Sequence, residues 1–221
     1  MEYLVLYNQH SDYQENYKVK RRVAVCNTER HVHFEDRPYD KVISYLQSDT
    51  NQYIETGIIP TNTTGIMVTL MRSNTTDTYL AGCRNDGNNT RWCIGSTGNV
   101  YGGWGSVLSS FSDGGNKITV YLNYLNDRKW RSSLTSTTYN LSTLSFTPTN
   151  NIRLFGSAGV SGSYTKWSGK IYEVKITDGS DIIMDLIPVR KGSVGYMYDK
   201  VSKQLFDNSG TGSFTLGPDV D

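Results

Sequence analysis

Hydrophobic and polar residues alternate over short stretches along most of the chain, as they do in half-buried β-strands. The regular alternation of residues 169–176 places Ile171 and Tyr172, each with its period-two neighbours, on opposite faces of one strand. One of these faces is therefore expected in the core and the other at the surface. No segment of useful length shows the 3.6-residue period of a helix, and no internal repeat is found. The pattern predicts an all-β chain.

Short strand candidates recur from residue 39 onward, separated by turns that are rich in Gly, Asn and Asp. Such spacing is typical of a β-sandwich or barrel. The expected strands are Lys41–Gln47, Tyr53–Ile59, Ile66–Arg72, Thr78–Cys83, Arg91–Gly95, Val100–Trp104, Lys117–Leu125, Lys129–Leu134, Ile152–Phe155, Lys170–Thr177, Ile182–Pro188 and Val194–Tyr198. The expected turns are Asn85–Asn89, Asp113–Asn116, Asn126–Asp127, Gly156–Gly159 and Thr177–Ser180.

The first 38 residues differ from the rest of the chain. The β-favouring runs Glu2–Tyr7, Tyr17–Val25 and His31–Phe34 predict three short strands, which are marginal on their own. This segment must therefore pack on the sandwich or on a partner. Pro38 restricts the residue before it and marks the boundary. We expect a small β module over residues 1–38 and a sandwich over residues 39–221.

Composition agrees with this fold class and narrows the function. The 221 residues include 16 Tyr and 21 Gly, a profile that favours strands and turns. The net charge is +1, so the chain does not show the basic excess of proteins that bind the phosphates of nucleic acids. One basic run stands out, at Lys18, Lys20, Arg21 and Arg22. It is either a docking patch for an acidic partner or a solvated strand face.

The N-terminus and the cysteines indicate the cellular compartment in which the protein is expected. The apolar stretch at Met1–Tyr7 is too short for a signal peptide or a membrane span, so we expect synthesis in the cytoplasm without export by a signal and no membrane partner. Cys26, Cys83 and Cys93 show no metal-ligand spacing and are interpreted as free thiols. A bridge between Cys83 and Cys93 is the alternative, which a reducing compartment disfavours.

The end of the chain carries a pattern of strand and turn signals. Asp199 follows the strand Val194–Tyr198 and is suited to begin a turn, and the segment Asn208–Gly212 tolerates positive φ angles. Phe206 and Phe214 are the expected core residues on either side. The sequence therefore predicts a closing hairpin that packs onto the sandwich.

Three segments together resemble a group of LamG-like, concanavalin-type jelly-roll proteins that are frequent in bacteriophages and on bacterial surfaces. They are Gln52–Pro60 (QYIETGIIP), Gly169–Thr177 (GKIYEVKIT) and Leu186–Asp219, which begins LIPVRKG. The resemblance covers about residues 39–221 and implies a jelly-roll sandwich. Lys203 stands where relatives commonly carry Gly, which leaves the hairpin turn open.

Many proteins of this fold hydrolyse glycosides, a reaction that needs two carboxylates flanking the scissile bond. The Glu-x-Asp-x-x-Glu spacing of such enzymes is absent. Within the predicted sandwich the only glutamates are Glu55 and Glu173, and strand alternation explains both as outward residues. We therefore expect no enzymatic activity.

Metal sites have little support in the sequence, and no cofactor is expected. His31 and His33 share a strand face, but no third ligand is evident. Calcium is the one metal that merits mention, because the resembling lectins use it. Loop oxygens of the kind that calcium binds are offered by Asp86, Asn88, Asn89 and Asp113, which serve equally well as ordinary turn formers.

Glycan binding requires exposed aromatic rings beside amide and carboxylate groups. The best set in the sequence is Trp92, Tyr101 and Trp104, near Asp86 and Asn88. Trp130 and Trp167 are weaker candidates. The alternative is that these aromatic residues belong to the core or to a sheet face.

The resemblance implies a structural protein of a bacteriophage virion: a head fibre, a capsid decoration or a tail-associated adhesin. The sandwich would face outward and possess a glycan-binding surface, and residues 1–38 would anchor it to other virion proteins. A homo-oligomer, with a trimer favoured, would be expected of a fibre. The alternative is a free carbohydrate-binding module or a bacterial surface lectin.

Overall fold

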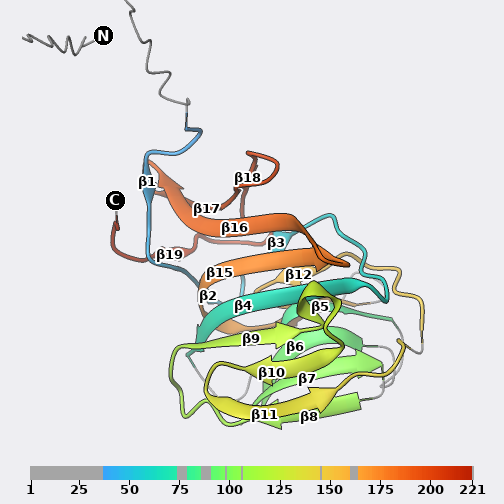
Figure 1. Ribbon diagram of the computed structural model, residues 1–221. Coiled ribbons are helices and arrows are strands. Elements are labelled where there is room, and N and C mark those ends of the chain that lie inside the picture. Colours follow the sequence, from blue (N-terminus) through green and yellow to red (C-terminus); the bar gives the residue numbers. More distant parts are fainter. Residues whose placement is uncertain are drawn as a thin grey trace, which may run out of the picture. The chain divides into compact units, whose positions relative to one another are not determined.

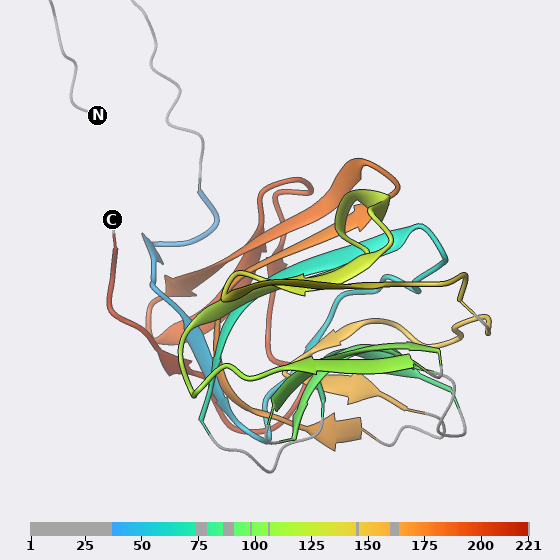
Figure 2. The ribbon, with the colours of Figure 1, turned by 60° about the horizontal axis from the view of Figure 1, so that its bottom comes forward.

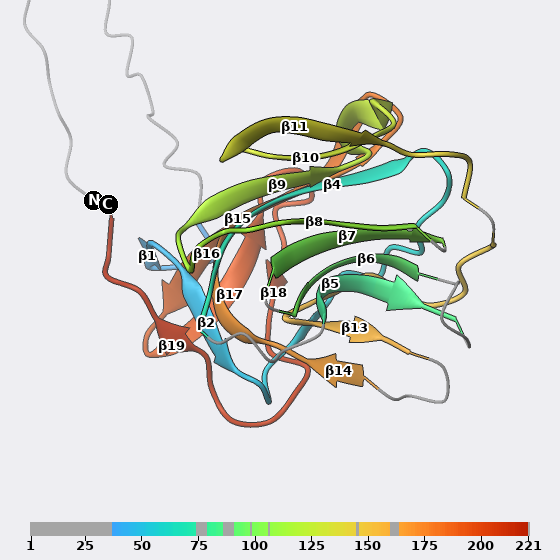
Figure 3. The same ribbon diagram turned by 90° about the horizontal axis from the view of Figure 1, so that it is seen from below.

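Two β-sheets face each other and enclose the core (Figures 1 and 3). The computed structural model describes residues 37–73, 79–85, 91–97, 99–105, 107–144, 146–159 and 164–220. Nearly all pairings between the described strands are antiparallel; a parallel one joins Ala158 to Cys83. The prediction of an all-β antiparallel sandwich is therefore confirmed, and the two layers are seen edge-on in Figure 2.

The larger sheet contains 11 of the described strands. Its main path runs β11 (Thr135–Asn140), β10 (Lys129–Ser132), β9 (Ile118–Leu122), β4 (Thr64–Arg72), β15 (Ser168–Asp178), β16 (Asp181–Lys191), β17 (Val194–Asp199) and β18 (Leu205–Phe206). Three short strands join it off this path: β1 (Lys41–Val42) pairs with β16, β2 (Leu46–Asp49) pairs with β15, and β19 (Thr215–Leu216) pairs with β2.

The smaller sheet contains eight of the described strands. Its main path runs β14 (Tyr164–Lys166), β13 (Gly156–Ala158), β5 (Tyr79–Arg84), β6 (Arg91–Thr97), β7 (Asn99–Gly105) and β8 (Val107–Phe111). The short strand β12 (Arg153–Leu154) pairs with β5 and with β3 (Ile54–Glu55). A 3₁₀ turn, η1 (Tyr124–Asn126), connects β9 to β10. No helix in the described ranges is long and apolar enough to cross a membrane.

The core is rich in aromatic side chains from both sheets. Trp92, Trp104, Trp130 and Trp167 are each at most 1% exposed. A buried indole N–H needs an acceptor, and two of these find one: Trp104 Nε1 donates to the Ser142 carbonyl oxygen at 2.7 Å, and Trp167 Nε1 to Ser96 Oγ at 3.2 Å. The tryptophans thus hold the two sheets together.

Several strand predictions are confirmed, and others are corrected. The predicted turn at residues 156–159 is wrong, because Gly156–Ala158 forms β13, in which Ser157 is 1% exposed and pairs with β14. The single strand predicted over residues 41–47 is split into β1 and β2. Strands β8 and β11 were not predicted, because Ser- and Thr-rich sequences have little hydrophobic alternation.

The predicted closing turn is confirmed. Asp199 is 1% exposed and its carboxylate accepts hydrogen bonds from the backbone N–H groups of Asp185, Val201 and Ser202 and from the Ser202 hydroxyl. Lys203 adopts a φ of 63°, a left-handed backbone conformation that glycine adopts more readily than other residues. Phe214 is 6% exposed and belongs to the core. Phe206 is partly buried and packs against this core.

The predicted module over residues 1–38 lies, apart from Arg37 and Pro38, outside the described residues. Its basic residues Lys18, Lys20, Arg21 and Arg22, together with His31, His33 and Cys26, fall in that segment.

Candidate functional site

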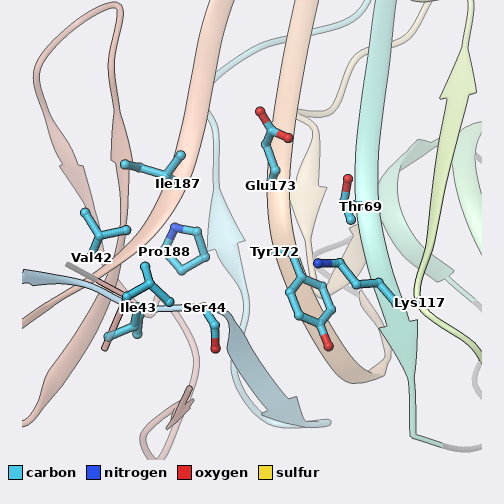
Figure 4. A pocket seen from close by; sticks show the side chains of 10 residues that line it. Val42, Ile43, Ser44, Thr69, Lys117, Tyr172, Glu173, Ile187 and Pro188 are labelled. Carbon is cyan, nitrogen blue, oxygen red and sulfur yellow. The ribbon is translucent and has the colours of Figure 1, made fainter. Parts of the chain in front are cut away.

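A shallow groove opens on the outer face of the larger sheet, where β15 and β16 separate (Figure 4). The two strands are paired as far as Val174 and Leu186. Beyond this point β15 pairs with β2 and β16 pairs with β1. The volume between the diverging strands is about 420 Å³. We call this the fork groove; its lining residues are Val42, Ile43, Ser44, Thr69, Lys117, Tyr172, Glu173, Ile187, Pro188 and Val220.

A β-bulge turns two consecutive side chains of β15 into the fork groove. Ile171 and Glu173 lie opposite neighbouring residues of β4, so Tyr172 is the extra residue. Such a bulge changes the direction in which a side chain points. Ile171 and Val174 remain fully buried in the core, whereas Tyr172 and Glu173 both line the groove. Strict alternation would have placed only one of this pair on the outer face.

Two adjacent tyrosine rings lie between two ammonium groups, and the first pair of this stack, Lys117 and Tyr172, lines one end of the groove. The Lys117 Nζ atom lies 4.0 Å from the centre of the Tyr172 ring. The Tyr45 ring meets Tyr172 edge-on, with ring centres 5.6 Å apart. The Lys170 Nζ atom in turn lies 4.3 Å from the centre of the Tyr45 ring. These contacts fix the orientation of Tyr172, since each cation–π contact contributes about 0.5–1 kcal/mol at an exposed site.

Polar groups surround Tyr172 on the other sides. The Glu173 carboxylate pairs with Lys175 Nζ at 3.1 Å, and this hydrogen bond raises the pKa of Lys175. The hydroxyls of Thr69 and Thr119 lie 2.9 Å apart. The Ser44 Oγ atom is buried and has no hydrogen-bond partner among the residues that the structure describes. The Thr69 hydroxyl and the Glu173 carboxylate are thus the polar groups of the groove lining that a ligand can reach, whereas Ser44 Oγ is covered by protein atoms.

The apolar wall of the groove is closed by the end of the chain. The Val220 backbone N–H donates to the Val42 carbonyl oxygen at 3.0 Å. Arg190 holds the preceding residue, Asp219, through two hydrogen bonds of 2.7 Å, one to each carboxylate oxygen. This hydrogen bonding from Arg190 lowers the pKa of Asp219. At neutral pH the carboxylate is therefore ionised, and the wall stays attached to β16.

The fork groove combines the features of a small-ligand site. Binding sites for small molecules are concave, mostly apolar and have a few polar groups that fix the orientation of the ligand. Here the apolar side chains Val42, Ile187, Pro188 and Val220 line the groove together with Tyr172 and the polar groups.

The tryptophans expected to bind glycans are core residues. Trp92 is 0% exposed and Trp104 is 1% exposed, and Trp130 and Trp167 are equally buried. Trp92 and Trp104 lie opposite each other on β6 and β7, with their rings between the sheets. Their ring faces are therefore covered by protein. The alternative interpretation, in which these aromatic residues belong to the core, describes them correctly.

Tyr101 is the exception in that predicted set, because it lies on the other face of β7. It is half-buried beside Tyr79, with ring centres 6.1 Å apart. Burial, followed by the proximity of Cys93 and Tyr79, raises the pKa of Tyr101. Asp86 and Asn88, its predicted partners, lie outside the described residues. A glycan surface at Tyr101 therefore stays a prediction.

The two glutamates of the sandwich belong to different sheets. Glu55, on β3 of the smaller sheet, pairs with Arg153 at 2.5 Å. Glu173, on β15 of the larger sheet, pairs with Lys175. Each carboxylate thus has its own basic partner. The two do not flank a common ligand site.

Asp113, named above as a candidate calcium ligand, has another partner. Its carboxylate forms a bidentate ion pair with Arg72, at 2.7 Å to Nε and 2.5 Å to Nη2, and both side chains are buried. This ion pair joins the end of β4 to the turn after β8. In the described ranges there is also no group of three or more His, Cys, Asp or Glu side chains that could hold a metal ion.

The two cysteines of the smaller sheet are free thiols, as predicted, and both are buried. Cys83 lies opposite Trp92, and Cys93 lies opposite Gly82 and Gly103. Burial raises the pKa of each thiol to about 12, so neither is a reactive thiolate at neutral pH.

Comparison with known proteins gives no relative: no protein-family model and no curated protein matches the chain.

The residues of the fork groove were not identified as a site from the sequence. One signal for them does exist in β15, where the core residues Ile171, Val174 and Ile176 are spaced by three and then by two. An interval of three in a strand of period two indicates a bulge. The contributions of residues 42–44 and 220 carry no such local signal, because they depend on how the two ends of the sandwich meet.

Proposed function

We propose that this protein is a non-enzymatic, glycan-binding β-sandwich that is displayed on a bacteriophage particle. The observation that carries the binding function is the fork groove, in which the Tyr172 ring lies beside hydroxyl and carboxylate groups and opposite an apolar wall. The support for the virion is the resemblance of the three sequence segments described above.

A sugar matches this groove in both of its chemical aspects. The C–H face of a pyranose ring packs on an aromatic side chain, and its hydroxyls donate to a carboxylate such as Glu173 or accept from a hydroxyl such as that of Thr69. The separation of Glu55 from Glu173 supports binding without hydrolysis.

The glycan-binding function is tested by a substitution that removes the aromatic ring of Tyr172. Tyr172→Ala is expected to weaken binding to an immobilised oligosaccharide panel by about tenfold or more, since aromatic stacking contributes on the order of 1–1.5 kcal/mol beyond burial. The matched control is Tyr121→Ala. Tyr121 lies on the same sheet face and has Arg131 3.9 Å above its ring, but it does not line the groove.

The control separates loss of the site from loss of the fold. Both variants lose one cation–π contact, so their melting temperatures should fall by similar amounts. Equal glycan binding by wild type and Tyr172→Ala would contradict the proposal, as would binding that falls equally in both variants.

Display on a particle is tested separately, by mass spectrometry of phage particles purified from a culture that produces the protein. We expect the chain in a fixed copy number per particle. Its absence from clean particles, combined with retained glycan binding, would instead favour a free carbohydrate-binding module or surface lectin.

A further inference from the structure

The charges around the fork groove are not balanced. Glu173, the one carboxylate that lines the groove, is already paired with Lys175. Lys200, on the same sheet, is likewise paired, at 2.9 Å from Asp185. Lys117 and Lys170 differ from these two, because their ammonium groups contact tyrosine rings and form no ion pair with any carboxylate in the described ranges.

The two unpaired ammonium groups belong to one connected stack. The order is Lys117, Tyr172, Tyr45 and Lys170, and the successive steps are 4.0, 5.6 and 4.3 Å. A cation held over an aromatic ring keeps most of its hydrogen-bonding capacity, since the ring occupies one side only and an ammonium has three donors. The stack therefore holds two positive charges: Lys117, which lines the groove beside Tyr172, and Lys170, which lies outside the groove lining on the far side of Tyr45.

From this charge distribution we infer that the ligand of the fork groove is an anionic oligosaccharide, with carboxylate or sulfate groups that pair with Lys117 and Lys170. The inference rests on the proposed glycan-binding function and names its ligand class. The ring of one sugar packs at Tyr172, and the anionic substituents of that sugar or its neighbour accept hydrogen bonds from the two ammonium groups. Charge-assisted hydrogen bonds of this kind are about twice as strong as neutral ones.

Calorimetric titration with three probes of equal length tests this inference: maltohexaose, which is neutral, hexagalacturonate, which carries carboxylates, and sulfated maltohexaose. We expect an anionic probe to bind wild-type protein at least about tenfold more tightly than the neutral one. The two anionic probes distinguish carboxylate from sulfate as the preferred group. The preference should decrease as salt is added, because exposed charges are screened.

The double variant Lys117→Met, Lys170→Met is expected to lose this preference, so that neutral and anionic probes bind it with equal affinity. Its matched control is Lys129→Met, Lys191→Met, which removes the same charge from two positions that lie neither in the groove lining nor in the stack with Tyr172 and Tyr45. The control should keep the full preference. Melting temperatures of both variants show whether the fold is intact.

Each outcome decides one of the two claims. Equal binding of neutral and anionic probes, or an unchanged preference in Lys117→Met, Lys170→Met, overturns the anionic ligand and leaves glycan binding standing. A preference that falls equally in the control shows a general charge effect and also overturns the inference. If none of the probes nor any member of the oligosaccharide panel binds, the proposed function itself is overturned.

Discussion

Asp199 illustrates how one buried carboxylate determines the course of the chain. Burial alone raises its pKa, but the hydrogen bonds from the Ser202 hydroxyl and from the backbone N–H groups of Asp185, Ser202 and Val201 outweigh this effect, so the net pKa is lowered. A carboxyl with a lowered pKa stabilises the fold above its unfolded pKa and loses this contribution as the pH falls through the folded value. The turn between β17 and β18 is therefore fixed at neutral pH.

Lys203, four residues later in the same turn, adopts a backbone conformation that disfavours its side chain. Its φ of 63° is left-handed, which costs a non-glycine residue about 1–2 kcal/mol. Lys203→Gly removes this cost. Glycine also raises the conformational entropy of the unfolded chain, which destabilises the fold by a smaller amount. The variant should gain about 0.5–1 kcal/mol in the free energy of unfolding measured with denaturant.

Val201→Gly is the matched control for this prediction. Val201 is exposed in the same turn and does not have a positive φ. Glycine at position 201 therefore adds only unfolded-state entropy, and stability should fall by about 0.5–1 kcal/mol. A loss of stability in Lys203→Gly as well would contradict the account of this turn.

At the scale of elements, β15 shows what local sequence does and does not determine. Its existence follows from the hydrophobic pattern, but strict alternation places Ile171 on the face opposite to Val174 and Ile176, whereas all three are buried in the core. The bulge at Tyr172 changes which side chains share the outer face, and only the three-residue interval hints at it. The strand is therefore predictable, whereas its contribution to the groove requires the pairing with β4.

Strands with little hydrophobic contrast lie at the limit of such predictions. β11 (Thr135–Asn140) is mostly exposed and rich in Thr, and β13 (Gly156–Ala158) consists of small residues that resemble a turn. Both are recruited by neighbouring strands, through the pairing of β11 with β10 and of β13 with β14. Tertiary context thus outweighs local propensity at these positions.

At the scale of the whole molecule, the sandwich class is predictable and the position of the site is not. The aromatic residues illustrate the reason, since the sequence favours Trp104 as a glycan contact and does not single out Tyr172. Trp104 lies at 1% exposure between the sheets, whereas Tyr172 lines the fork groove. Whether a ring faces inward or outward depends on the alternation of side chains along the strand. A single bulge moves the side chains that follow it to the opposite face.

The central claim, that the fork groove binds a glycan, is tested most directly by a crystal structure of the protein with the tightest-binding oligosaccharide of the panel. We predict a sugar ring packed beside Tyr172, with hydroxyls in reach of Thr69 and Glu173. A sugar bound elsewhere, for example at Tyr101 on the smaller sheet, with the fork groove left empty at saturating ligand, would contradict the account.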